Sequence, residues 1–167
     1  MDFLSEYNIT LHMGYLNKQK NLYSVMEKSY PEIRGASVEK IKRMRIPTRD
    51  KEEIFRLSGL ILGHEVFFSS FDSSYRSSPA VRKSFGSEAN FLYEMYSHAK
   101  DREGFLFIHK DNSKITFDVY SDFSKCIPKR PILAIDLAEH AYFYDYAFSK
   151  EDYLRAALKS LNLSLLE

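Results

Sequence analysis

Apolar side chains recur at helical spacing through the first hundred residues. Residues 8–29 predict a long helix, because four side chains share one face at intervals of four, three and four. These are His12, Leu16, Gln19 and Tyr23. Pro31 follows this stretch and predicts its end. Residues 51–71 predict a second helix and residues 79–100 a third, separated by a loop rich in serine.

The pattern changes after residue 100 to short runs that alternate or are continuously apolar, as strands do. The runs are 104–109, 115–119 and 132–135. Asp111, Asn112 and Ser113 between the first two predict a hairpin turn. From Ala138 onward the pattern again predicts helix, to the end of the chain.

Helices followed by a small sheet with helices predict an α+β fold. We expect an N-terminal helical hairpin followed by an α/β part with a three-stranded antiparallel sheet. The predicted division places the hairpin in residues 1–75 and the α/β part in residues 76–167. A chain of 167 residues is long enough for the two parts to share one real core.

Composition excludes several classes of protein. The formal net charge of +1 gives no overall field that would attract nucleic acid or membrane. The longest apolar runs are too short to span a bilayer, and the first residues lack the pattern of a secretory signal. A single cysteine, Cys126, rules out an internal disulfide framework and favours a reducing compartment. We expect an intracellular protein, cytoplasmic or mitochondrial.

Basic residues concentrate in residues 40–51. They are Lys40, Lys42, Arg43, Arg45, Arg49 and Lys51. A solvated helix face and loop would explain this segment, and so would a contact with RNA or another acidic partner in a ribonucleoprotein. The segment alone leaves both interpretations open.

Asp136 and His140 stand four residues apart after an apolar run. On a turn or at a helix start, this spacing lets a carboxylate and an imidazole converge on one point, as metal ligands do. A surface aspartate and a core histidine would fit the same spacing.

The wider context of this pair resembles the iron/manganese superoxide dismutase family. The segment from Asp136 to Tyr142 is similar to the family signature Asp-x-Trp-Glu-His-Ala-Tyr. Similar matches are Gly63-His64-Glu65-Val66-Phe67-Phe68, Phe85-Gly86-Ser87, Gly104-Phe105-Leu106-Phe107 and Asp152-Tyr153-Leu154. Their order and spacing agree with the family from about residue 11 to residue 163.

The resemblance implies four ligands for an iron or manganese ion. The ligands would be His12, His64, Asp136 and His140. It also implies the conversion of superoxide to oxygen and hydrogen peroxide. A homodimer would form around Glu139, which in the family reaches the ligand histidine of the partner, here His140.

Residues around the implied ligands depart from the family pattern. Lys20 stands where the family has a tyrosine at the entrance, and Leu60 where iron enzymes have a glutamine. Ala138 replaces a tryptophan, in a chain that contains no tryptophan. Lys20 could supply a proton or attract an anion, and in a relative with another reaction Lys20 or Lys125 could act as an anion clamp.

These departures leave three functions open. The first is a divergent dismutase. The second is a metal-binding relative with a different reaction. The third is a non-catalytic structural or interaction protein of this fold, for example a mitochondrial ribosomal subunit.

Overall fold

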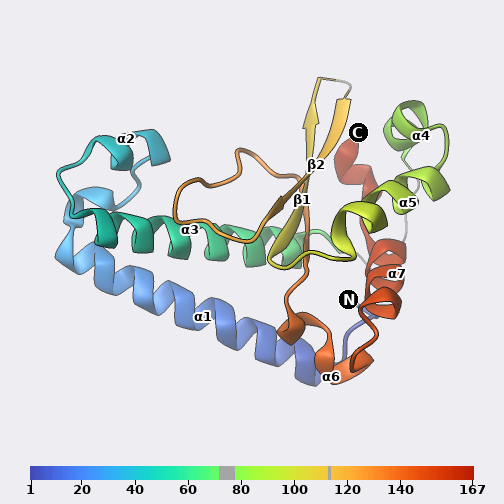
Figure 1. Cartoon of the computed structure of the whole chain (residues 1–167), viewed down its shortest axis with the longest axis horizontal. Coiled ribbons are helices and arrows are strands. Elements are labelled where there is room, and N and C mark those ends of the chain that lie inside the picture. Colours follow the sequence, from blue (N-terminus) through green and yellow to red (C-terminus); the bar gives the residue numbers. More distant parts are fainter. Residues whose placement is uncertain (72–77, 113) are drawn as a thin grey trace.

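Two long antiparallel helices form the first part of the molecule, and a small sheet with shorter helices forms the second (Figure 1). The computed structural model describes residues 1–71, 78–112 and 114–167. The long helices are α1 (Glu6–Ser29) and α3 (Thr48–Ser69). Ser5 begins α1, because its side chain accepts a hydrogen bond from the Asn8 amide. The predicted helical hairpin is confirmed.

A short helical segment connects the two long helices at the left-hand end of the molecule in Figure 1. It comprises the 3₁₀ turn η1 (Pro31–Ile33) and helix α2 (Val38–Arg43). Its apolar side chains form a separate small core with the first half of α3. That core contains Ile33, Ile41, Ile46, Ile54 and Phe55. The basic residues of this segment therefore surround a packed structure rather than an extended loop.

The single helix predicted over residues 79–100 is two helices, α4 (Pro79–Phe85) and α5 (Glu88–Ala99). Gly86 ends α4 with a left-handed φ of 77°, and its amide donates to the Arg82 carbonyl. Ser87 then caps α5 by accepting from the Asn90 amide. The prediction of one helix was wrong because the apolar period continues across this break.

The three predicted strands form an antiparallel sheet in the order β2-β1-β3. The strands are β1 (Phe105–Asp111), β2 (Lys114–Tyr120) and β3 (Leu133–Asp136). Asn112 adopts a left-handed φ of 54° in the predicted hairpin turn, whereas Ser113 lies outside the described residues. The predicted fold class, α+β with a three-stranded antiparallel sheet, is confirmed. The division at residue 75 stays a prediction, because that junction also lies outside the described residues.

The C-terminal part is less continuous than the predicted helix. Four short elements follow the sheet, namely η2 (Glu139–Ala141), α6 (Phe143–Tyr146), α7 (Lys150–Ser160) and η3 (Leu163–Leu166). Ala147 interrupts the helix with a φ of 47°, which is unusual for a residue with a side chain. Ser149 then starts α7 by accepting from the Asp152 amide.

Close packing fixes α3 against the rest of the fold. Gly59 and Gly63 leave room for two aromatic rings, since a Cβ atom would lie 2.2 Å from Phe123 Cγ and 2.7 Å from Phe105 Cε2. The helix segment that follows Gly63 therefore sits directly on the first residue of β1. Within the described residues, no helix is long and apolar enough to cross a membrane.

Candidate metal centre

The four ligand candidates from the sequence converge on one point between α1, α3 and the end of β3. One nitrogen or oxygen atom from each of His12, His64, Asp136 and His140 lies within 4.8 Å of the others. Asp136 Oδ2 lies 3.1 Å from the Nε2 atom of His12, 3.7 Å from that of His64 and 3.2 Å from that of His140. The residues come from both parts of the chain.

The two helices contribute one imidazole each. His12 lies in the second turn of α1 and is completely buried, and its ring packs 4.9 Å from Phe67. His64 lies in α3, where its ring meets the Phe105 ring edge-on at 5.0 Å. The contact with Phe105 depends on the missing side chain of Gly63 described above. Helix packing therefore determines where both rings point.

A backbone hydrogen bond fixes the protonation of the His64 ring. Its Nδ1 lies 2.8 Å from the Leu60 carbonyl, which accepts only from a protonated nitrogen. Burial lowers the pKa of His64 below its usual value, so the imidazole is neutral near pH 7. With the proton on Nδ1, the lone pair is on Nε2, which faces the Asp136 carboxylate. This is the tautomer that a metal ligand requires.

Hydrogen bonds from Ala138 and Tyr153 hold two of the three Asp136 oxygens. Its Oδ1 accepts from the Ala138 amide at 2.9 Å, and its backbone carbonyl accepts from the Tyr153 hydroxyl at 2.8 Å. These bonds leave Oδ2 facing the histidines. Burial would raise the pKa of Asp136, but contacts with His12 and His140 outweigh it and hold that pKa below the usual value. The site thus contains a buried carboxylate anion.

The turn after β3 places the fourth ligand. The 3₁₀ turn η2 brings His140 back over Asp136, four residues before it. His140 is 27% exposed, whereas His12 and Asp136 are completely buried and His64 is 1% exposed. Solvent therefore reaches the four residues on the His140 side.

The residues fit a metal ion. The Nε2 atoms of His64 and His140 are buried and have no hydrogen-bond partner, although both are close to the carboxylate. Ligand atoms with bonds of about 2.0–2.2 Å to one metal lie about 3–4 Å apart, which the distances to Oδ2 match. Three imidazoles and one carboxylate suit iron, manganese or zinc.

Tyr15 contacts the site, and the sequence analysis missed it. Its ring lies on the His140 ring, with centroids 4.4 Å apart and planes tilted by 38°. Tyr15 itself is 38% exposed, so it forms part of the cover between His140 and solvent. Its position three residues after His12 could have indicated this, because side chains three apart are neighbours on a helix.

The two predicted lysines are not among the four converging residues. Lys20 Nζ pairs with Glu65 Oε1 at 2.7 Å, and both side chains are about half exposed. Lys125 is exposed in the loop between β2 and β3. Their predicted roles as proton source or anion clamp stay predictions. The Leu60 side chain offers no hydrogen bond, so α3 supplies only its carbonyl at this position.

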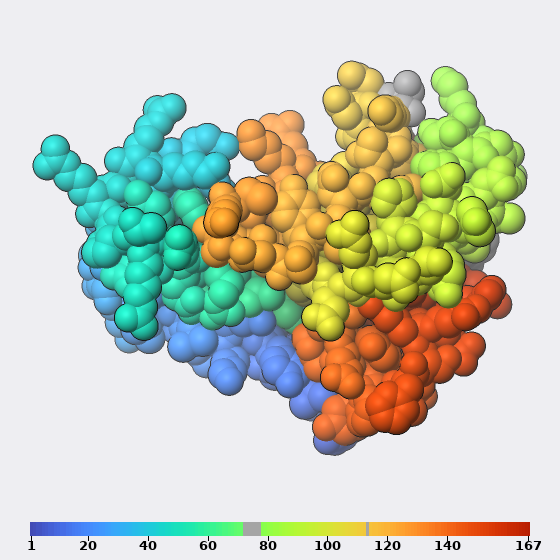
Figure 2. All heavy atoms as spheres, viewed as in Figure 1, coloured from blue at the N-terminus to red at the C-terminus, as the bar shows by residue number. Residues whose placement is uncertain are grey.

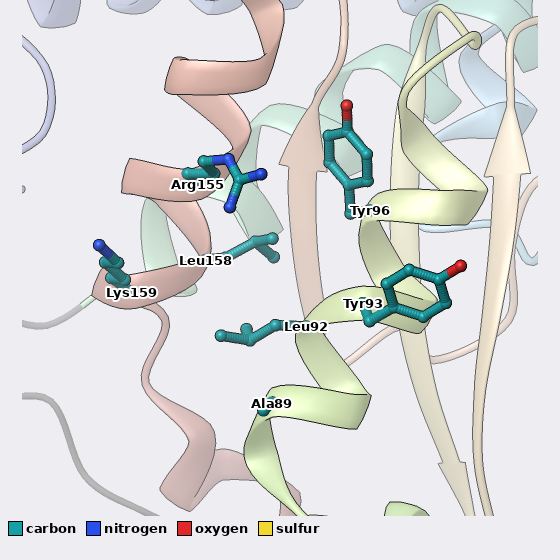
Figure 3. A pocket seen from close by; sticks show the side chains of 7 residues that line it. All are labelled: Ala89, Leu92, Tyr93, Tyr96, Arg155, Leu158 and Lys159. Carbon is teal, nitrogen blue, oxygen red and sulfur yellow. The ribbon is translucent and has the colours of Figure 1, made fainter.

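A groove between α5 and α7 is separate from this centre. Figure 3 shows Leu92 on α5 reaching toward Leu158 on α7, with Tyr96 and Arg155 beside them. The groove has a volume of about 260 Å³ and contains none of the four converging residues. Arg155 also pairs with Glu151 at 2.6 Å, which reduces its availability to a ligand.

Comparisons with known proteins agree with the site. Residues 73–167 match the family model described as iron/manganese superoxide dismutases, C-terminal domain. The superoxide dismutase [Fe] of Synechococcus elongatus is 24% identical over 160 residues, covering 90% of this chain and 77% of that protein. The superoxide dismutase [Mn/Fe] of Porphyromonas gingivalis is 23% identical over 175 residues, covering 98% and 89%.

A third relative matches over a similar extent. The superoxide dismutase [Fe] of Bacteroides fragilis is 25% identical over 181 residues, covering 98% of this chain and 89% of that protein. The alignments thus include α1 and α3, which precede the matched C-terminal domain. The domain match spans more than half of the chain and contains two of the four converging residues, Asp136 and His140. The chain belongs to the iron/manganese superoxide dismutase family.

Proposed function

We propose that the protein is a divergent superoxide dismutase that binds iron or manganese through His12, His64, Asp136 and His140. One observation carries the proposal. Three imidazole Nε2 atoms lie within 3.1–3.7 Å of a single oxygen of a buried carboxylate, in a chain of the dismutase family. The names of the three relatives support iron or manganese as the metal.

The metal would supply the one-electron chemistry, accepting an electron from one superoxide and giving one to the next. The chain's own residues would hold and shield it. The Asp136 carboxylate would offset the positive charge of the ion, in a site where Asp136, His12 and His64 are buried. The Leu60 carbonyl fixes the ring orientation of His64, and Tyr15 covers the exposed ligand His140.

The supply of protons should differ from that in the family, because the tyrosine at the entrance is replaced. Lys20, which stands at the position of the family's entrance tyrosine, pairs with Glu65 at 2.7 Å. We propose that protons come from solvent on the exposed side of His140, so turnover would be slow for this family. A metal-binding relative with another reaction is the second candidate, favoured by the apolar Leu60 and the engaged Lys20.

We also propose a homodimer through the surface around Glu139 and His140. Large exposed aromatic side chains gather on the segment that follows Glu139 and His140. The Tyr7 ring of α1 meets the Tyr144 ring of this segment edge-on, with centroids 5.2 Å apart. The exposed side chains are Phe143, Tyr144 and Phe148. Glu139→Ala would weaken the dimer and metal retention together, measured by light scattering and elemental analysis. A wild-type monomer with full metal content would contradict the dimer.

The experiment that separates the candidates measures metal content and superoxide turnover on the same sample. The wild type should contain iron or manganese in near-stoichiometric amount and consume superoxide. Asp136→Asn should lose both, whereas Asp101→Asn, at an exposed position, should keep both. Metal without turnover would favour the second candidate. Absence of metal after loading would favour a non-catalytic protein, with the basic residues 40–51 as a possible contact to a ribonucleoprotein.

A further inference from the structure

A large hollow in the described surface lies away from the metal centre, between α2 and the loop that joins β2 to β3. These segments meet along one edge of the molecule, α2 in cyan and the loop in orange (Figure 2). The hollow has a volume of about 790 Å³, which is within the range of about 300–1,000 Å³ for small-molecule sites. None of the four converging residues lines it.

Packing holds the two sides of the hollow in place. Ile127 from the loop packs against the small core that contains Ile41 of α2. Lys51 donates to the carbonyls of Lys42 and Met44, which fixes the end of α2 on the start of α3. The hollow therefore exists before any ligand arrives.

Positive charge is available inside it. Two carboxylates line the hollow, against the three cations Lys42, Lys129 and Arg130. Lys129 Nζ lies 3.4 Å from Glu39 Oε1 and offsets its charge, whereas His109 Nε2, 3.6 Å from Asp118 Oδ2, offsets that charge only when the ring is protonated. Lys42 and Arg130 form no ion pair in the part of the chain that the structure describes. An ammonium and a guanidinium that face one hollow are the groups that bind phosphate.

An aromatic surface adjoins these cations. Tyr120 lines the hollow, and the Phe123 ring stacks on it with centroids 5.8 Å apart and planes within 3°. Such a supported ring offers a flat apolar surface on which a nucleobase can stack. Arg130 has a left-handed φ of 49°, a strained conformation for a residue with a side chain, and such strain concentrates at functional positions.

We propose that this hollow binds a nucleoside phosphate, with its phosphates at Lys42 and Arg130 and its base beside Tyr120. The ligand chemistry is that of a free nucleotide or of one unit in single-stranded RNA. The other cations on and after α2 extend the positive surface beyond the hollow, as a longer strand would require. The proposal is independent of the metal and of dismutase activity.

Isothermal titration of the full chain at low salt tests the proposal with three probes: ADP, inorganic pyrophosphate and a ten-nucleotide oligouridine. ADP should bind, and pyrophosphate should bind more weakly because it has no base. The double variant K42Q/R130Q should lose at least tenfold in affinity for ADP. The control K83Q/K159Q removes the same charge from α4 and α7, at the opposite end of the molecule, and should bind as the wild type does.

The oligouridine distinguishes the two sources. Binding of RNA at least tenfold tighter than ADP, with the same loss in K42Q/R130Q, would identify single-stranded RNA as the ligand. Equal or weaker binding of RNA would identify a free nucleotide. The proposal is overturned if neither ADP nor RNA binds, or if the control variant loses as much affinity as K42Q/R130Q. Circular dichroism and metal content should be unchanged in both variants.

Discussion

The Tyr15 ring lies 4.4 Å from the ring of His140, the one residue of the metal centre that solvent reaches appreciably. α1 thus contributes to the centre twice, with His12 from its inner face and Tyr15 from the edge of the helix. The aromatic ring restricts both the orientation of His140 and access to it.

Removing this ring should make the metal easier to lose. Contacts between aromatic rings contribute about 0.5–1.5 kcal/mol, so Tyr15→Ala should speed metal loss to a chelator by about 2- to 10-fold. Tyr15→Phe keeps the ring and should release metal at the wild-type rate. Equal rates for Tyr15→Ala and the wild type would show that the ring does not hold His140.

A methyl group at Gly63 should disturb the centre through Phe105. The added Cβ would lie 2.7 Å from the Phe105 ring, which itself touches His64. We expect Gly63→Ala to cost about 1–3 kcal/mol in the free energy of unfolding and to reduce metal affinity. Urea unfolding and metal titration measure the two effects.

Gly14→Ala is the matched control. Nothing lies within 4 Å of a Cβ at Gly14, and alanine favours a helix interior by about 1 kcal/mol over glycine. This variant should therefore be as stable as the wild type or more so, with unchanged metal affinity. A loss of stability in Gly14→Ala equal to that in Gly63→Ala would mean that the effect is not due to Phe105.

The hydroxyl of Tyr153 should matter for the position of Asp136. Tyr153→Phe leaves the buried Asp136 carbonyl without its donor, which should cost about 1–3 kcal/mol in the free energy of unfolding. Tyr142→Phe, at a residue that is only half-buried, should cost much less. Thermal unfolding of both variants in the metal-free state checks this, and equal losses would argue against a specific role of Tyr153.

Acid should destabilise the metal-free protein through His64. Burial lowers the folded-state pKa of His64, so below pH about 6.5 the unfolded chain binds a proton that the folded chain does not. The free energy of unfolding should therefore fall as the pH drops through this range, by about 1.4 kcal/mol for each pH unit between the two pKa values. His64→Gln should flatten this dependence in urea titrations at pH 5 to 7.5. An unchanged slope in this variant would assign the pH dependence to other groups.

The four converging residues could be predicted from the sequence because the family resemblance implied them, and three of them lie in elements that the apolar pattern also predicted. His12 and His64 lie within uninterrupted helices, and Asp136 ends a strand whose apolar run is plain. Their convergence then followed from the family resemblance. Interruptions of the helices were harder to predict, since Ala147 ends α6 with a left-handed φ that its residue type does not indicate.

The contacts between individual side chains also could not be predicted from the sequence. The family resemblance implied an entrance role for Lys20, which stays a prediction, and the structure pairs its flexible side chain with Glu65 on α3. The stacking of Tyr15 on His140 depends on how α1 and η2 cross, which no local pattern encodes. The family resemblance therefore predicted the residues of the site, and tertiary packing decided the partners of the side chains at its edge.

Each of the two parts of the fold contributes two of the four converging residues, and this has a consequence for how the fold opens. His12 and His64 belong to the helical hairpin, whereas Asp136 and His140 belong to the part that contains the sheet. An ion bound to all four would cross-link positions that are up to 128 residues apart, and it would favour only conformations in which both parts are docked. Chelation should then accelerate amide hydrogen exchange first in β3 and in the turns of α1 and α3 that pack around the metal centre. Exchange in the rest of each helix should change little.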